Sequence, residues 1–202
     1  TDIEQVIVTG ATDLLTGTTQ NIAENQTGLT QAIEKGSALT LQPITSQLDD
    51  IALLQYTGGT TGVSKGASIT HRNIIANSQQ TLERIGPYCA FGTDTFVCPL
   101  PLYHSYAFTV NMIMFASKGN QNILIPNPRD LDAFVNALKG IQFTGFAGLN
   151  TLFVGLCQHP EFQKLDFSKL RFTTSGGTTL TTASSDLWLK TTGCTISEGY
   201  GL

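Results

Sequence analysis

Charged side chains are scarce in this 202-residue sequence, at 13% against about 25% in a typical soluble domain. Neither sign dominates, because 11 lysines and arginines stand against 15 aspartates and glutamates, for a formal net charge of −4. A surface that follows nucleic-acid phosphates needs an excess of lysine and arginine, so we expect no nucleic-acid partner. Hydrophobic residues make up 41%, which excludes intrinsic disorder and predicts a real core.

Cysteines and long apolar runs are also few. The four cysteines stand far apart, with no C-x-x-C pair and no histidine at zinc-finger spacing, so we expect reduced thiols in a cytoplasmic protein. No apolar run approaches the roughly 18–20 residues that a membrane-spanning helix needs. The longest candidate, residues 110–116, contains Asn111. We therefore expect a chain that does not cross a membrane.

The two ends of the sequence predict a piece of a longer protein. The chain begins at Thr1 without an initiator methionine or a signal segment, and it stops directly after the glycine-rich Glu198-Gly-Tyr-Gly. Residues 1–48 show weak periodicity, and we expect them to form a lead-in with one strand near Val6-Ile7-Val8 followed by irregular segments. The pattern is stronger over residues 49–202, which we expect to form one compact unit.

Short apolar runs alternate with amphipathic stretches in this second part. Strands that alternate with helices predict an α/β fold with a layered, mostly parallel sheet flanked by helices. The expected strands cover residues 52–56, 67–70, 95–98, 122–125, 143–147, 170–174 and 195–197. The expected helices cover residues 72–85, 106–117, 131–138, 151–159 and 181–192.

The segment Tyr56-Thr-Gly-Gly-Thr-Thr-Gly-Val-Ser-Lys-Gly66 combines four glycines, three threonines, one serine and Lys65. Glycines let successive N–H groups turn toward an anion, hydroxyls add donors, and a lysine supplies a mobile positive charge. This combination favours a polyphosphate ligand. A glycine-rich hairpin without a ligand would leave Lys65 unexplained.

Two other motifs compete for this segment. A Walker A loop needs serine or threonine after its lysine, and Gly66 stands there instead. Gly62-Val-Ser-Lys-Gly66 formally matches the Gly-x-Ser-x-Gly nucleophile elbow of hydrolases, with His104 or His159 as a base in principle. An elbow requires an immediate helix, whereas the pattern here predicts a strand first and a helix only near His71. The loop should therefore join two strands, which disfavours a hydrolase.

Glycine clusters follow three of the expected strands. They stand at residues 56–66, 175–177 and 199–201. In open parallel sheets the ligand binds beyond the carboxyl ends of the strands, where loops lead into helices. This placement predicts a ligand site at that edge.

Four motifs, in this order, resemble those of the adenylate-forming enzymes, the superfamily of acyl-CoA synthetases, luciferases and peptide-synthetase adenylation domains. They are residues 56–66, Pro99-Leu-Pro-Leu-Tyr-His-Ser105, Ser175-Gly-Gly-Thr178 and Glu198-Gly-Tyr-Gly-Leu202. Residues 54–62, 127–130 and 148–153 resemble the bacterial long-chain fatty-acid CoA ligases most closely. Ser64 departs from the pattern, since many members have proline there. The resemblance covers residues 49–202 well and residues 1–48 poorly.

The resemblance implies a role for each motif. The phosphate loop would cradle the β- and γ-phosphates of ATP, the later glycines would bind adenosine, and Tyr200 would stack on adenine. His104 would orient the substrate carboxylate and the reactive phosphate, although the residues alone favour a half-buried histidine that only packs. His71 and Arg72 are expected to be structural. The implied site residues are Thr57, Gly58, Gly59, Thr60, Thr61, Gly62, Lys65, His104, Gly176, Gly177 and Tyr200.

The resemblance also implies substrates and cofactors. They are a fatty acid, ATP, Mg²⁺ and CoA, and the fatty substrate could draw the parent protein to the inner face of a membrane. The glutamate that helps to hold Mg²⁺ in the family would lie just past Leu202, with Thr57 or Thr61 contributing at most indirectly. A ribose-binding aspartate and a lysine on a C-terminal domain would also lie beyond it, so we expect the fragment alone to be inactive.

Two alternatives stay open at this stage. The first is an adenylation domain that loads an amino or aryl acid onto a carrier protein. The second is a nucleotide-binding module without chemistry.

Overall fold

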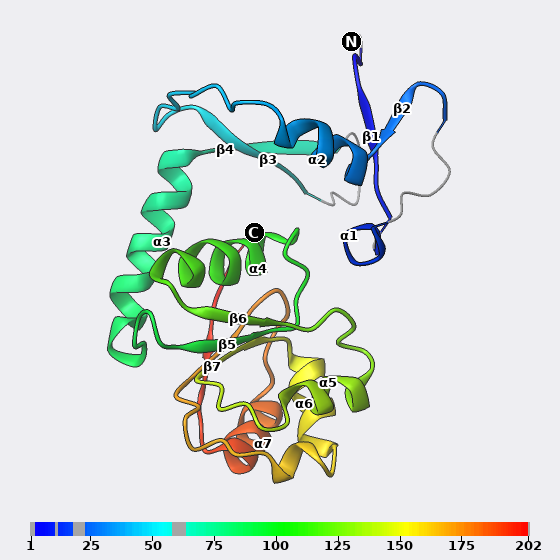
Figure 1. The fold of residues 1–202 in the computed structure, drawn as a ribbon. Helices are drawn as coiled ribbons and strands as arrows, with labels where there is room; N and C mark the ends of the chain where they lie inside the picture. Colours follow the sequence, from blue (N-terminus) through cyan, green and yellow to red (C-terminus); the bar gives the residue numbers. More distant parts are fainter. Residues whose placement is uncertain (1–2, 11, 18–22, 58–63, 202) are drawn as a thin grey trace. The chain divides into compact units, whose positions relative to one another are not determined.

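The computed structural model describes residues 3–10, 12–17, 23–57 and 64–201. The chain divides into two compact units, residues 1–46 and residues 47–202. Figure 1 shows the order of their elements along the chain.

The first unit contains more regular structure than the sequence predicts. Strand β1 (Val6–Val8) pairs in parallel with β2 (Gln26–Gly28), and helices α1 (Asp13–Thr16) and α2 (Leu29–Ser37) accompany them. The expectation of one strand followed by irregular segments is therefore wrong. The buried Asp13 explains part of the difference, because its carboxylate accepts the Gly10 N–H at 2.7 Å and holds the turn where α1 begins.

The second unit opens with a hairpin and a long helix. Strands β3 (Ile51–Thr57) and β4 (Lys65–Thr70) are antiparallel, and α3 (His71–Ile85) follows without a break. The helix begins at His71 because the Thr70 hydroxyl accepts the Asn73 N–H while the Asn73 side chain accepts the Thr70 N–H. A strand, not a helix, thus follows Ser64, which removes the geometry of a nucleophile elbow.

Five parallel strands form the main sheet, and they confirm the predicted α/β class. Their spatial order is β6-β5-β7-β8-β9, and every pair is parallel. The strands are β5 (Thr95–Cys98), β6 (Gln121–Leu124), β7 (Gly145–Gly148), β8 (Phe172–Ser175) and β9 (Ile196–Glu198). Since all five run the same way, their carboxyl ends meet at one edge.

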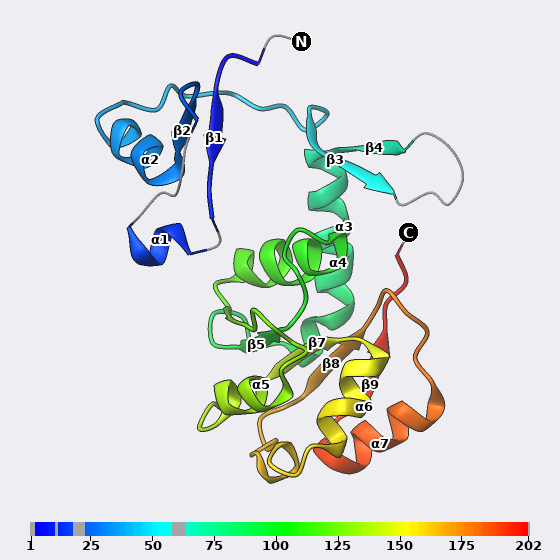
Figure 2. The same ribbon diagram turned by 90° about the vertical axis from the view of Figure 1, so that its right-hand side faces the viewer.

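Helices cover both faces of this sheet (Figure 2). One face carries α5 (Leu131–Leu138), α6 (Asn150–Gln158) and α7 (Thr182–Thr192), and the other carries α3 with α4 (Ser105–Ala107) and η2 (Phe108–Phe115). The segment η2 is a π-helix, so the single helix predicted over residues 106–117 is in fact three short pieces of different pitch. Short helical turns complete the unit: η1 (Gly86–Tyr88), η3 (Ala116–Lys118) and η4 (Phe162–Lys164). Among the described residues, no helix is long and apolar enough to cross a membrane.

A hydrophobic core lies on each side of the sheet. Beneath α5, α6 and α7, the Trp188 ring lies 5.1 Å from Phe146 and 4.8 Å from Phe153, centroid to centroid. On the other face, Phe96 of β5 stacks on Phe115 of η2. These aromatic layers fix the spacing between strands and helices and so position the loops at the carboxyl edge.

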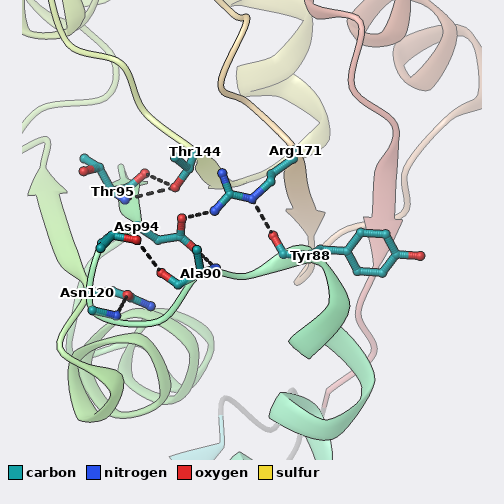
Figure 3. A network of polar contacts seen from close by, with 9 residues as sticks. Tyr88, Ala90, Asp94, Thr95, Asn120, Thr144 and Arg171 are labelled. Atoms are coloured by element: carbon teal, nitrogen blue, oxygen red, sulfur yellow. Dashed lines mark hydrogen bonds and ion pairs between the residues drawn. The ribbon is translucent and has the colours of Figure 1, made fainter.

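A polar network joins the opposite, amino-terminal edge (Figure 3). Asp94, which precedes β5 and is only 2% exposed, pairs with Arg171, which precedes β8, and also accepts the Ala90 N–H at 2.6 Å. The Thr144 hydroxyl, ahead of β7, accepts the Thr95 N–H at 3.0 Å. These contacts hold strand starts together and lie far along the strands from the glycine segments, so we assign them a structural role.

Candidate active site at the carboxyl edge of the sheet

The two later glycine segments meet at the carboxyl edge. The Gly199 N–H donates to the Ser175 carbonyl at 2.8 Å, which joins the end of β9 to the end of β8. Gly177 has a φ of +79°, a left-handed conformation that favours glycine. Tyr200 follows Gly199 with 89% of its surface exposed. An exposed ring beside exposed backbone groups is a suitable platform for a flat heterocycle.

His104 stands before helix α4, which follows β5. Its Nδ1 accepts the Tyr106 N–H at 3.2 Å, so the side chain caps the helix. In the neutral ring the proton then resides on Nε2, which is left as a donor. The imidazole is exposed, and the expectation from the residues alone of a half-buried packing histidine is wrong.

Lys65 lies in the hairpin. It opens β4 opposite Thr57 and is exposed. Within the described residues, Lys65 has no ion pair or hydrogen bond to the carboxyl edge. The predicted phosphate-loop residues Gly58, Gly59, Thr60, Thr61 and Gly62 lie outside the described residues.

Tyr106 also lies at the carboxyl edge of the sheet. The sequence motifs predicted no role for it, and only its aromatic surroundings set it apart. Its ring packs on Gly176, where an added Cβ would meet ring carbons at 3.2 Å. Burial raises the pKa of Tyr106 to about 12, and Thr174 and the Gly148 backbone offset part of that rise. The phenol therefore stays neutral near pH 7 and cannot act as a base there.

A groove of about 490 Å³ opens beside the same edge, on the face that carries α5 and α6. Its walls come from the segments that follow β5, β6 and β7, so no single stretch of sequence reveals it. Most lining side chains are apolar, and Arg129 supplies a cation. The lining residues are Pro99, Leu100, Pro128, Arg129, Leu131, Leu149, Thr151, Leu152 and Gly155.

No group of three or more histidine, cysteine, aspartate or glutamate side chains in the part of the chain that the structure describes could hold a metal ion. The carboxyl edge thus presents backbone groups, an imidazole donor and an aromatic ring. Such groups can bind and orient a ligand and stabilise its charge. They form no nucleophile–base pair of the kind needed for covalent catalysis.

Comparison with known proteins gives a consistent picture. A sequence model of the family described as "AMP-binding enzyme" matches residues 2–202. The long-chain-fatty-acid–CoA ligase of Salmonella typhimurium is 47% identical over 154 residues, which are 76% of this chain and 28% of that protein. The chain thus spans less than a third of this relative's length.

Solved structures share the fold. The anthranilate CoA ligase AuaEII in complex with anthranoyl-AMP superposes with a TM-score of 0.80 at 23% identity, over 99% of this chain and 36% of that one. ATP-bound MatB from Rhodopseudomonas palustris gives a TM-score of 0.70 at 26% identity, over 88% of this chain and 35% of that one.

Proposed function

The chain belongs to the AMP-binding enzyme family, and we propose that it forms part of a ligase that activates a long-chain fatty acid with ATP and joins it to CoA. The main support for a long-chain fatty acid as the substrate is the 47% identity to a bacterial long-chain-fatty-acid–CoA ligase. The glycine segments gathered at the carboxyl edge support the nucleotide half of the proposal.

Two displacement steps make up the proposed reaction. A carboxylate oxygen of the acid attacks the α-phosphorus of ATP, an O–P bond forms, and the bond to pyrophosphate breaks, which leaves an acyl-adenylate. The sulfur of CoA then bonds to the acyl carbon, AMP leaves with its phosphate oxygen, and the thiol proton passes to solvent. The protein's task is to align the reactants and stabilise phosphate charge.

His104 would act as a hydrogen-bond donor. With Nδ1 occupied by the Tyr106 N–H, only Nε2 is available to a ligand. A neutral imidazole can donate from Nε2 to a carboxylate or phosphate oxygen and hold the two in line. The exposure of the ring supports this role, because a packed imidazole could not reach a substrate.

The phosphates would be bound by Thr57, Gly58, Gly59, Thr60, Thr61, Gly62 and Lys65. The composition of this loop supports the assignment, since its backbone N–H groups, hydroxyls and one cation suit an anion. Adenosine would lie against Gly176 and Gly177, with Tyr200 stacked on the base. The left-handed Gly177 and the exposed Tyr200 support this part.

Mg²⁺ would supply charge stabilisation at the phosphate oxygens when bound. The described residues do not offer a ligand set for it. Thr57 or Thr61 could contribute only indirectly, and we propose that an acidic ligand lies outside residues 1–202.

The groove beside α6 would take the extended arm of CoA. It lies on the face of the sheet that carries α5 and α6, whereas α4 lies on the other face, to which we assign the fatty acid. Thr151→Trp, which would fill the groove from its exposed first helical turn, should then slow thioester formation while acyl-adenylate still forms. Loss of adenylate formation instead would assign the groove to the acyl chain.

The deciding experiment is acid-dependent exchange of labelled pyrophosphate into ATP by the full-length protein, with long-chain, short-chain, aryl and amino acids compared. Exchange with long-chain acids alone supports the proposal, and exchange with another acid moves the substrate class. No exchange with any acid would indicate a nucleotide-binding module without chemistry. Lys65→Ala should reduce exchange about 100-fold, while the exposed Lys190→Ala serves as the matched control.

We also propose that the protein is cytoplasmic and associates peripherally with a membrane through its fatty substrate. We further propose that a C-terminal domain completes the site. Flotation of the full-length protein with phospholipid vesicles tests the first point. Protein that stays at the bottom of the gradient with and without fatty acid would contradict it.

A further inference from the structure

Tyr106 lies where three structural elements converge. It belongs to α4, its ring contacts Gly176 after β8, and its hydroxyl faces Thr174 of β8 and the backbone of Gly148 at the end of β7. Among the described residues, the hydroxyl has no partner in hydrogen-bond geometry, so the ring and not the hydroxyl makes the principal contact.

The segment Gly176–Gly177 is held from two sides. Tyr106 packs against Gly176, and the Leu149 side chain lies 3.7 Å from where a Cβ of Gly177 would stand. Neither glycine has a side chain of its own to anchor it, and a left-handed backbone such as that of Gly177 is one of several conformations open to glycine. The Tyr106 ring and the Leu149 side chain therefore limit the conformations that are open to the segment.

We propose that Tyr106 is a positioning residue that sets the Gly176–Gly177 backbone for the nucleotide. The inference rests on the proposed function, in which these glycines bind adenosine. Tyr106 also donates its N–H to His104, so the same residue orients the imidazole and supports the nucleotide loop. Tyr106 thus contacts His104 through its N–H group and Gly176 through its ring.

The competing interpretation is an ordinary core aromatic. A core residue would affect the stability of the fold and leave the nucleotide affinity of the folded protein unchanged. A residue that lined the acid site would change the KM for the fatty acid. If Tyr106 positions the glycine segment, its substitution should change nucleotide affinity. Another flat ring should replace it, and the effect of the substitution should depend on the residue at position 176.

The test uses the full-length protein with Tyr106→Phe, Tyr106→Leu, Gly176→Ala and the double variant Tyr106→Leu/Gly176→Ala. Tyr88→Leu, a change at an exposed tyrosine on η1, is the matched control. ATP affinity is measured by calorimetry without acid, and KM values for ATP and fatty acid by pyrophosphate exchange. Circular dichroism confirms that each variant is folded at the assay temperature, and Tyr106→Met replaces Tyr106→Leu if the latter does not fold.

We expect Tyr106→Phe to stay within about twofold of wild type, and Tyr106→Leu to weaken ATP binding about tenfold with little change in the KM for fatty acid. Gly176→Ala should also weaken ATP binding, because its methyl group would press on the ring, and Tyr106→Leu should partly restore it in the double variant. Unchanged ATP affinity in Tyr106→Leu, a change confined to the KM for fatty acid, or additive losses in the double variant would each overturn the proposal. Since ATP binding is read without acid, the test stands even if exchange fails with every acid.

Discussion

Gly145 occupies a position where β7 approaches the Phe96 ring so closely that an added methyl group would overlap ring carbons. Gly145→Ala should therefore lower the free energy of unfolding by about 1–3 kcal/mol, since either the ring or the strand must shift. Urea denaturation measures the change. Gly86→Ala in η1, within the same unit, is the matched control, because nothing lies within 4 Å of its added methyl group. Equal losses in both variants would show that the collision does not cause the effect.

Cys89 is half-buried, and burial, followed by the nearby Asp94 carboxylate, raises its pKa from 9.0 to about 11, with Arg171 offsetting part of the rise. Because the thiolate is the nucleophile, alkylation of folded Cys89 by iodoacetamide should be slow at pH 8 and accelerate as the pH approaches 11. Peptide mass spectrometry can follow this against the urea-unfolded chain. Equal rates in the two states would refute the prediction.

The raised pKa of Cys89 also makes the stability of the folded protein depend on pH. The folded pKa of Cys89 lies above the ordinary thiol value, so the neutral thiol favours the folded state. That contribution is fully present below pH 9 and is lost as the pH rises through about 11.

At the level of elements, the two edges of the sheet differ in chemistry. The amino edge is held by side-chain pairs such as Asp94–Arg171, whereas the carboxyl edge ends in glycine segments in which Gly176 is buried and Gly177 and Gly199 are exposed. The first arrangement fixes strand starts, and the second leaves donors available to a ligand. Rigid support at one edge and open backbone at the other is what a binding site on a parallel sheet requires.

The Asp94–Arg171 pair provides an element-scale prediction. Arg171→Met would leave the buried Asp94 carboxylate without its cation, and the free energy of unfolding should fall by about 3 kcal/mol. Arg72→Met is the matched control, because Arg72 pairs with the exposed Asp49 and its loss should change stability little. Chemical denaturation of both variants gives the comparison. A larger loss for Arg72→Met would contradict the structural role of the network.

At the scale of the whole molecule, both hydrophobic cores draw, among the described residues, on those between Leu82 and Ile196. A chain of residues 47–202 should therefore unfold cooperatively without the first unit. Circular dichroism during thermal unfolding of that chain measures this. A broad, non-cooperative melt would mean that the core of the second unit depends on residues 1–46.

Residues 1–202 alone should form no acyl-adenylate, because the proposed function places further groups of the site, an acidic metal ligand among them, outside this chain. The measurement is thin-layer detection of labelled adenylate after incubation with ATP, Mg²⁺ and long-chain acid, with the full-length protein as positive control. Turnover above background by the fragment would show that it carries a complete adenylation site.

Much of the second unit could be predicted from sequence. Residues 95–98 and 131–138 form a strand and a helix with the predicted bounds, because one is a short apolar run and the other begins after a capping aspartate, Asp130. The segment over residues 106–117 was predicted helical, but its continuous apolar pattern does not distinguish an α-helix from a π-helix. There the buried Asn111 donates to Asn122 of β6, a contact between elements that no local pattern contains.

The sequence by itself determined the fold class, the glycine segments and their place after the strands, because these depend on periodicity and on residue types that act locally. Only the tertiary structure decided which groups meet at the two edges of the sheet. The packing of Tyr106 on Gly176, the groove walled by three separate loops and the Asp94–Arg171 pair all join residues far apart in the chain. Such contacts follow from the spatial order of the strands in the sheet. That order depends on the burial of whole faces of the sheet and not on any one segment.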